Sequence, residues 1–338
     1  MRGENLTRAE ASSLLDALLD GEATDSQIAA ALVALAVKGE TVEELAGMAE
    51  AMRARSARIN CRHDHFIDTA GTGSSHAKTF NVSTAAAFVI AGAGLPVAKH
   101  GSRAATSRSG SADVLATLGV NVTAERAISE TCLNEIGICF MFAPLYHAAT
   151  ARVAGVRREL GVHTTFNLLG PLTNPAGAPR QIIGVWHKAL VEPLARTLSL
   201  LGTKRAWVVH GSDGLDELTL SGKSFVAEAK GDGEVKSFEV APGDFGLRDG
   251  SLEHLRGGDA TMNARIIREV LAGERRDEAR SLVVMNAAAA IFVGGAAEDL
   301  PRATRLAEQS IDTGSAQDKL NRLVETTNHG FSDGDNGA

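Results

Sequence analysis

Apolar residues near the N-terminus recur at the three- and four-residue spacing of amphipathic helices. This spacing covers residues 11–19 and 28–37, and it predicts two helices that each bury one face. Thr41, with Glu44 three residues later, has the pattern of a capping box and predicts the start of a third helix. We therefore expect a small, all-helical N-terminal domain that ends at residue 65.

From residue 66 onward the pattern changes to short apolar runs separated by Gly/Ser/Thr loops and helical segments. The order strand–loop–helix occurs twice in residues 66–118, which is typical of a parallel α/β sheet. The further buried strands that we predict are residues 138–142, 181–186, 206–210 and 281–285. The helices that we predict between them are residues 151–160, 190–201, 262–271 and 287–293.

These patterns predict an α/β fold with a mainly parallel central sheet in residues 66–338. The looser alternation over residues 219–249 fits either an antiparallel edge or an excursion from the sheet. The polar, Gly-rich C-terminus predicts a frayed tail from about residue 326.

Composition and charge exclude several classes of protein. Hydrophobic residues make up 44% and charged residues 22% of the 338 residues, an ordinary globular balance. The formal net charge of −7 argues against general nucleic-acid binding, which needs a basic surface. No signal-peptide core and no membrane-length apolar run occur. Three cysteines without a CxxC pair are expected to be reduced thiols, so we predict a cytoplasmic protein.

Two Gly/Ser-rich segments, Gly71–Thr84 and Lys99–Ser111, follow the first two predicted strands. Glycines let the backbone approach an anion, and hydroxyls, amides and a following helix N-terminus can hold phosphate. Either segment alone is also compatible with an ordinary capped turn, and neither the Walker pattern nor GxGxxG is present. Because ligands bind at the carboxyl ends of strands in open α/β sheets, the pair predicts a site for a phosphorylated small molecule.

Two other segments add candidate chemistry. Asp216 and Glu217 follow a predicted strand in a Gly-rich loop, and beside phosphate loops such carboxylates suit Mg²⁺. Either Arg157 or Arg158 could pair bidentately with a ligand carboxylate. His147 and His163 are open to structural and functional interpretations, and no zinc-type Cys/His spacing occurs.

In order and spacing, these segments resemble the anthranilate phosphoribosyltransferases of tryptophan biosynthesis. The resemblance includes residues 142–147, 156–161 and 167–174 and covers nearly the whole chain. It implies a nucleoside phosphorylase/phosphoribosyltransferase-like fold, with helices from about residues 160–180 joining the N-terminal helical domain. It also implies an active site at the hinge between the domains and a homodimer joined through the helical domain.

The resemblance implies transfer of the 5-phosphoribosyl group from phosphoribosyl pyrophosphate (PRPP) to the amine of anthranilate, with Mg²⁺ and without nucleic-acid or membrane partners. The residues that it assigns to PRPP are Gly71, Ser74, Ser75, Thr79, Asn81, Val82, Ser83, Thr84, Lys99, His100, Gly101, Ser102, Arg103, Ala104, Ala105, Thr106, Ser107 and Ser111. Those that it assigns to anthranilate are Gly71, Ser102, His147 and Arg157. Those that it assigns to Mg²⁺ are Ser83, Asp216 and Glu217. No general base is assigned; His100 and His147 are the candidates.

Three motifs depart from the family pattern. Ser74 and Ser75 replace the last two residues of the family's GTGGD, and Ser102 replaces the Asn of its KHGNR. The family's HHPA is Tyr146-His-Ala-Ala here. Ser75 can donate to phosphate but cannot hold a cation as Asp does, and Ser102 lacks the amide near the acceptor.

Two alternatives to this reaction remain open. The first is a pyrimidine nucleoside phosphorylase-like enzyme, which Mg²⁺ dependence would distinguish. The second is a non-catalytic or nucleic-acid-associated relative. The acidic charge and the presence of Arg157, Asp216 and Glu217 argue against that second alternative.

Overall fold

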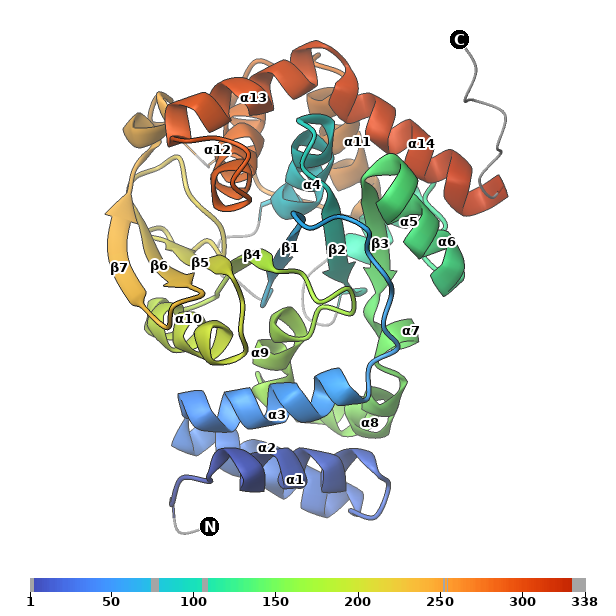
Figure 1. The fold of residues 1–338 in the computed structure, drawn as a ribbon, viewed down its shortest axis with the longest axis vertical. Coiled ribbons are helices and arrows are strands. Elements are labelled where there is room, and N and C mark those ends of the chain that lie inside the picture. The colour runs from blue at the N-terminus through green and yellow to red at the C-terminus, as the bar shows by residue number, and fades with distance from the viewer. Residues whose placement is uncertain (1–2, 74–78, 105–108, 252, 254, 330–338) are drawn as a thin grey trace.

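A layer of helices lies at one end of the molecule, and a sheet covered by helices on both faces forms the rest (Figure 1). The computed structural model describes residues 3–73, 79–104, 109–251, 253 and 255–329. No helix within these residues has both the length and the apolar character needed to cross a membrane. The three cysteines are free thiols.

The three N-terminal helices include the predicted segments, and the third begins after the predicted cap, Thr41. They are α1 (Arg8–Leu19), α2 (Asp25–Lys38) and α3 (Val42–Ala54). Thr41 caps α3, and the fully buried Glu44 carboxylate accepts the N–H groups of Thr41 and Leu6. Two later helices, α8 (Ala151–Leu160) and α9 (Thr165–Leu172), pack against these three and share their apolar core. The helical layer therefore combines segments that are about a hundred residues apart in sequence.

A seven-stranded sheet has the order β3-β2-β1-β4-β5-β6-β7. Its strands are β1 (Ile67–Gly71), β2 (Val97–Gly101), β3 (Ile138–Phe142), β4 (Arg180–Gly184), β5 (Arg205–Gly211), β6 (Ser224–Lys230) and β7 (Val235–Val240). Strands β1 to β5 are parallel, whereas β6 and β7 pair antiparallel at one edge. The loosely alternating segment is thus an antiparallel edge rather than an excursion.

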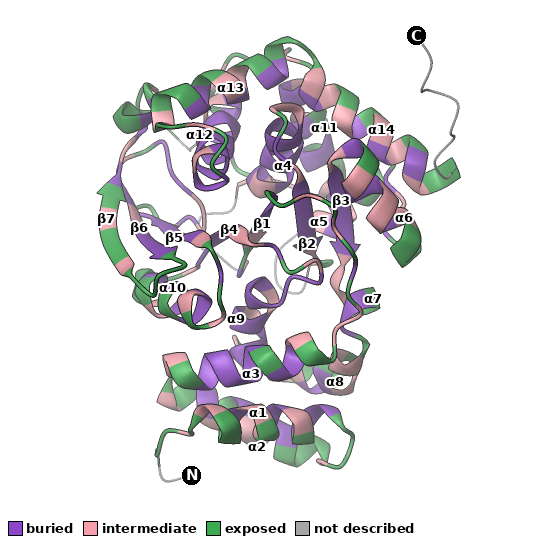
Figure 2. Ribbon diagram, viewed as in Figure 1, coloured by how far each residue is buried: buried purple, intermediate pink, exposed green. Residues whose placement is uncertain are grey.

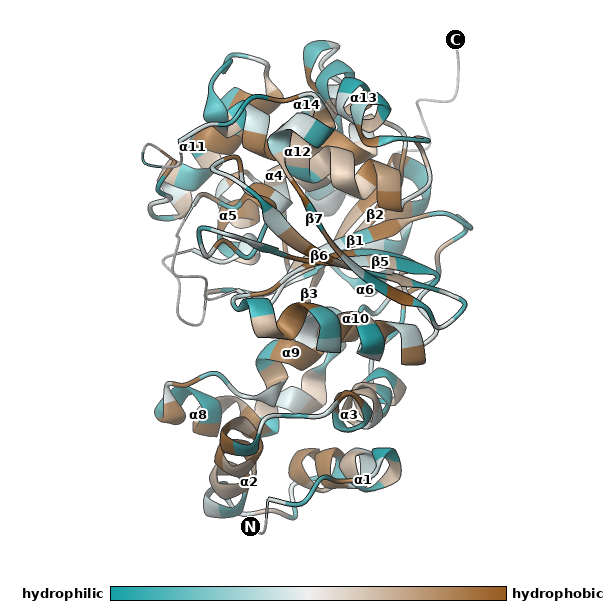
Figure 3. Ribbon diagram, turned by 90° about the vertical axis from the view of Figure 1, so that its left-hand side faces the viewer, coloured by the Kyte–Doolittle hydropathy of each residue, from teal (hydrophilic) through white to brown (hydrophobic). Residues whose placement is uncertain are grey.

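Helices cover both faces of this sheet, as Figure 3 shows with the strands between two helical layers. One face carries α4 (Val82–Gly92), α11 (Ala260–Leu271), α12 (Glu278–Val293), α13 (Leu300–Asp312) and α14 (Ser315–His329). The other face packs on α10 (Val191–Leu200). Short elements complete the chain: α5 (Ser111–Thr117), α6 (Arg126–Thr131), the π-helical turn η1 (Cys132–Ile136), α7 (Ala143–Tyr146) and the 3₁₀ turns η2 (Ala148–Thr150), η3 (Lys188–Leu190) and η4 (Pro242–Phe245).

Two hydrophobic cores lie on opposite faces of the sheet. Successive strand residues point to opposite faces, so Ile182 and Trp207 join the core under α4 and α12, while Ile183 and Val208 join the core that reaches the helical layer. Strands with both faces buried are expected for a parallel sheet between helices. Figure 2 shows the central strands and α12 almost wholly buried.

One prediction about the C-terminal part of the chain was wrong. Residues 281–285, predicted as a strand, lie inside the sixteen-residue helix α12. A short apolar run cannot be assigned to strand or helix by periodicity alone, and the Ala-rich continuation and the Asp277 cap favour helix. Helix α14 continues to His329, with Thr326 buried, and residues 330–338, on which the predicted tail falls, lie outside the described residues.

Candidate active site

The carboxyl ends of the parallel strands meet at the sheet edge that faces the helical layer. Strand β3 leads into α7 and then α8, so this edge adjoins the helical layer (Figure 1). The chain leaves β1 toward β2 on one side, and β4 lies on the other side. The end of β1 is therefore a topological switch point, which is where open α/β sheets bind ligands.

Glycines bring the loop after β5 against the ends of β1 and β4. A β-carbon added at Gly184 would lie 1.6 Å from the backbone oxygen of Asp216, so only glycine permits this approach. A β-carbon at Gly71 would lie 3.6 Å from the Asp216 carboxylate. The predicted phosphate loop and the predicted metal loop are therefore in contact.

The first Gly/Ser-rich segment runs from Gly71 into the N-terminus of α4. Ser74 and Ser75 lie outside the described residues, whereas Thr79, Asn81 and Ser83 are half-buried. Val82 and Thr84 point into the core. The first turn of a helix has N–H groups without intrahelical partners and carries partial positive charge. The segment thus presents a helix N-terminus suited to an anion.

Glu217 connects the metal loop to this helix N-terminus. Its carboxylate accepts the Ser83 N–H at 3.0 Å. Burial, together with the neighbouring charge of Asp216, raises the Glu217 pKa well above its usual value, and the Ser83 N–H and Lys99 oppose that rise. Two adjacent carboxylates with a buried member are stabilised by a cation, and their oxygens with the Ser83 hydroxyl suit Mg²⁺. No cluster of three or more His, Cys, Asp or Glu side chains able to hold a metal occurs among the described residues.

Lys99, at the carboxyl half of β2, is a buried amine beside this site. It is only 4% exposed, and its Nζ donates to the Thr69 carbonyl at 2.6 Å. Burial lowers the Lys99 pKa to about 8, although the charges of Asp68 and Glu217 act to raise it. At neutral pH the amine is therefore a cation close to the point where it titrates.

Sequence reasoning missed the group that balances Lys99, the fully buried Asp68 of β1. Its carboxylate accepts from the Asn174 side chain at 2.7 Å and from the His100 backbone N–H at 3.2 Å. Burial raises the Asp68 pKa to about 6, against the effect of Lys99. An acidic residue inside an otherwise apolar predicted strand was the available signal.

The second Gly/Ser-rich segment is held by another residue that was missed, Asp113 in the first turn of α5. Its carboxylate accepts the backbone N–H groups of Ala104 and Gly110, each at 3.0 Å, and pairs with Arg103. Arg103 thus serves partly as an anchor for its own loop. Ser102 is exposed, and its carbonyl accepts a hydrogen bond from the Ser111 hydroxyl at 3.4 Å. Gly101 is half-buried. Ala105, Thr106 and Ser107 lie outside the described residues.

Arg157, rather than the exposed Arg158, turns inward from the last turn of α8. Its guanidinium lies 5.1 Å from the centre of the Phe166 ring, and its Nη2 donates to the Asn167 side chain at 3.5 Å. Burial lowers the Arg157 pKa, and its Nε is buried without a hydrogen-bond partner among the described residues. A partly desolvated guanidinium with an unpaired donor is suited to a ligand carboxylate.

The histidines occupy different places around α9. The rings of His100 and His147 lie edge to face, 5.1 Å apart, and burial lowers the pKa of His100 to about 3 and that of His147 to about 4. Both are therefore neutral near pH 7 and add no charge to the site. His163 stacks on Trp186 at 4.3 Å, across the boundary between the helical layer and the sheet.

Comparisons with known proteins match both halves of the chain. The helical bundle domain of the glycosyl transferase family matches residues 1–56, and that family's a/b domain matches residues 63–317. Anthranilate phosphoribosyltransferase of Anaeromyxobacter sp. (strain K) is 52% identical over 327 residues, which cover 97% of this chain and 96% of the relative.

Solved structures agree with these matches. The crystal structure of anthranilate phosphoribosyltransferase from Thermus thermophilus has a TM-score of 0.91 and 40% identity, with 96% of this chain and 97% of that chain covered. The Saccharomyces cerevisiae enzyme in complex with PRPP and Mg has a TM-score of 0.84 and 28% identity, with coverage of 94% and 93%.

Proposed function

The chain belongs to the anthranilate phosphoribosyltransferase family of glycosyl transferases, and we propose that it transfers the 5-phosphoribosyl group of PRPP to the amine of anthranilate. Pyrophosphate is the second product, and the reaction belongs to tryptophan biosynthesis. The observation that carries this proposal is the meeting of the α4 N-terminus, Glu217 and the buried Lys99 at one sheet edge.

The reaction needs stabilisation of a leaving pyrophosphate. As the bond between the ribose anomeric carbon and pyrophosphate breaks, negative charge grows on the leaving oxygens and positive charge on the sugar. Donors that are already oriented toward the place where charge develops usually contribute more to catalysis than any other single effect. The candidates for such donors here are the Ser83 N–H in the first turn of α4, which donates to Glu217 in this structure, and the ammonium group of Lys99, which donates to Thr69.

Mg²⁺ would be held by Ser83, Asp216 and Glu217 together with the oxygens of the bound pyrophosphate group. When bound, the ion supplies positive charge that offsets the charge of the pyrophosphate. The support from this chain is its set of oxygen ligands and the raised pKa of Glu217, whose ionised form is disfavoured by burial and by Asp216 and would be favoured by a bound cation.

Anthranilate would be positioned through its carboxylate by Arg157, with Asn167 fixing the guanidinium. The exposed Gly71 and Ser102 and the buried His147 complete the acceptor contacts that the resemblance implies. Holding the amine in line with the anomeric carbon replaces a bimolecular encounter by an oriented one, which lowers the entropic part of the barrier. The aniline nitrogen loses its proton after attack, and neutral His147 remains a candidate to accept it.

The proposed assembly is a homodimer joined through the helical layer. Its support is an apolar patch on α2, where Val33 and Val37 lie four residues apart and are 40% and 83% exposed. Light scattering of wild-type protein and of Val37→Glu tests it: a dimer that becomes monomeric supports the proposal, and a wild-type monomer contradicts it. The cytoplasmic location stays a prediction from the sequence.

One assay tests the activity directly. Purified protein is mixed with PRPP, anthranilate and Mg²⁺, and the loss of anthranilate fluorescence is followed, with EDTA as the control. Parallel reactions contain a pyrimidine nucleoside and inorganic phosphate. Magnesium-dependent consumption of anthranilate supports the proposal, whereas nucleoside cleavage without anthranilate turnover would replace it.

A further inference from the structure

A segment far along the chain lies against the first phosphate loop. We call residues 255–259, which lead into α11, the backing segment. Arg256 forms an antiparallel bridge with Thr79. A β-carbon added at Gly257 would lie 2.2 Å from the Thr79 carbonyl oxygen, so the two backbones are in direct contact. Residues about 180 positions away in sequence therefore pack against the loop that is expected to hold pyrophosphate.

Asn263 of α11 continues this contact as a chain of oriented amides. The backbone N–H of Gly258 donates to Asn263 Oδ1 at 2.8 Å, and Asn263 Nδ2 donates to Asn81 Oδ1 at 3.0 Å. Asn81 Nδ2 in turn donates to the Ser109 carbonyl at 3.2 Å. Asn263 is only 3% exposed. The chain connects the backing segment to both Gly/Ser-rich loops.

The two ends of the chain determine the orientation of both side-chain amides. A backbone N–H can only donate and a backbone carbonyl can only accept. The Gly258 N–H therefore requires the oxygen of Asn263, and the Ser109 carbonyl requires the nitrogen of Asn81. Turning either amide over would place two donors or two acceptors together. An amide nitrogen has two hydrogens, and Asn81 uses one of them on Ser109.

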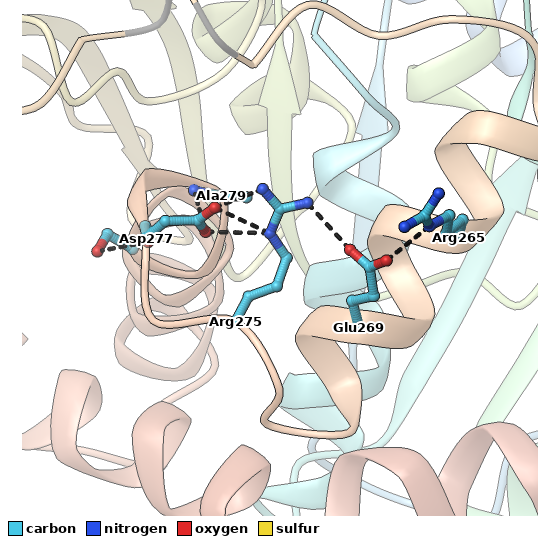
Figure 4. Close-up of polar contacts among 6 residues, drawn as sticks. Arg265, Glu269, Arg275, Asp277 and Ala279 are labelled. Carbon is cyan, nitrogen blue, oxygen red and sulfur yellow. Dashed lines mark hydrogen bonds and ion pairs between the residues drawn. The ribbon is translucent and has the colours of Figure 1, made fainter.

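Helix α11, which carries Asn263, is itself anchored to α12. Glu269 of α11 pairs with Arg275, and Arg275 pairs with Asp277, the N-cap of α12 (Figure 4). Arg265 also bonds to Glu269 within α11. The position of Asn263 is therefore fixed by contacts of α11 with a helix in the core of the α/β domain rather than by a loop.

We propose that Asn263 is a positioning residue for PRPP binding: it orients Asn81 so that residues 79–81 of the first Gly/Ser-rich segment and Ser109 of the second hold one arrangement. This inference rests on the proposed function, because it takes the ligand of these loops to be PRPP. Among the described residues, the hydrogen bonds of this chain of amides do not include Arg157 or α9, which form the acceptor side of the site.

The test is Asn263→Asp, which keeps the shape and the acceptor for Gly258 but cannot donate to Asn81. PRPP binding is measured by calorimetry with Mg²⁺, and KM is measured for each substrate. We expect PRPP to bind about tenfold more weakly, because the Asn81 oxygen loses its buried donor, with KM for anthranilate within about twofold. In a cycle with Asn81→Ala, the two changes should not be additive, because both remove the same contact.

Two further variants make the result decisive. Asn263→Ala removes the same donor without adding charge, and it should weaken PRPP binding in the same way. Ser310→Ala is the matched control, since it deletes a buried 2.8 Å bond to the Val89 carbonyl of α4, away from the loops. Unchanged PRPP affinity in both Asn263 variants, or equal losses for PRPP and anthranilate, would overturn this inference and leave the proposed function standing. Wild-type protein that binds no PRPP would instead overturn the proposed function on which it rests.

Discussion

The pKa of Lys99 leads to a specific prediction for the pH dependence of PRPP binding. Burial lowers this pKa from 10.5 to about 8, despite the charges of Asp68 and Glu217. A shift of that size corresponds to about 3 kcal/mol in favour of the neutral amine. The side chain is 4% exposed, so solvent screens it little. Lys99, the cation that would stabilise pyrophosphate, is therefore almost fully protonated below about pH 7 and loses its charge as pH rises through about 8.

The size of the effect follows from the same pKa. With a pKa of about 8, roughly half of the Lys99 amine is protonated at pH 8 and about a tenth at pH 9, so the PRPP Kd should rise about fivefold over that interval, which is about 1 kcal/mol. Asp68→Asn removes the largest charge that raises the Lys99 pKa. In that variant the alkaline loss of affinity should begin at lower pH.

Calorimetric titration with PRPP and Mg²⁺ from about pH 6.5 to 9.5 measures this dependence. Lys99→Met should bind weakly and without the alkaline loss, which separates Lys99 from ionisation of PRPP itself. Lys223→Met is a matched control, because that amine pairs with Glu239 on the surface and should leave the profile unchanged. A flat wild-type Kd up to about pH 9.5, or an alkaline loss that persists in Lys99→Met, would refute the reasoning.

Three other predictions concern the acceptor, the metal and the fold. Arg157→Ala should raise KM for anthranilate at least about tenfold and leave KM for PRPP nearly unchanged, because a bidentate ion pair is lost; equal effects in steady-state kinetics contradict this. Glu217→Gln should raise the Mg²⁺ concentration for half-maximal rate at least about tenfold, with an unchanged dependence arguing against the metal assignment. Glu44→Ala removes the acceptor of the Leu6 and Thr41 N–H groups and of Lys38. It should destabilise the protein by roughly 2–4 kcal/mol in urea unfolding, and a loss below about 0.5 kcal/mol would contradict it.

The elements that were predicted well are those with strong local signals. Thr41 caps the helix that its capping pattern indicated, and strands β3 to β5 lie at the predicted apolar runs. In a capping box the hydrogen-bond partners are three residues apart, so the local sequence contains both halves of the interaction. The same reasoning failed for residues 281–285, where burial on all sides removes the periodicity that separates strand from helix.

The chemistry of the site was only partly accessible to sequence reasoning. The two Gly/Ser-rich segments, Asp216 and Glu217 follow strands directly, and parallel strands bring their carboxyl ends to one edge. That topological rule needs no knowledge of side-chain packing. It was enough to place the candidate phosphate and metal residues together.

Only the tertiary structure decided how those groups are held and charged. Asp68 lies beside Lys99 because β1 and β2 are neighbours, and burial, which no local pattern encodes, shifts the pKa of both. Asn263 reaches Asn81 across 182 positions because α11 packs against α4. Hydrogen-bond partners at that separation are specified by the packing of helices on the sheet, whereas the sequence by itself determined the strands, the caps and the loops that this packing brings together.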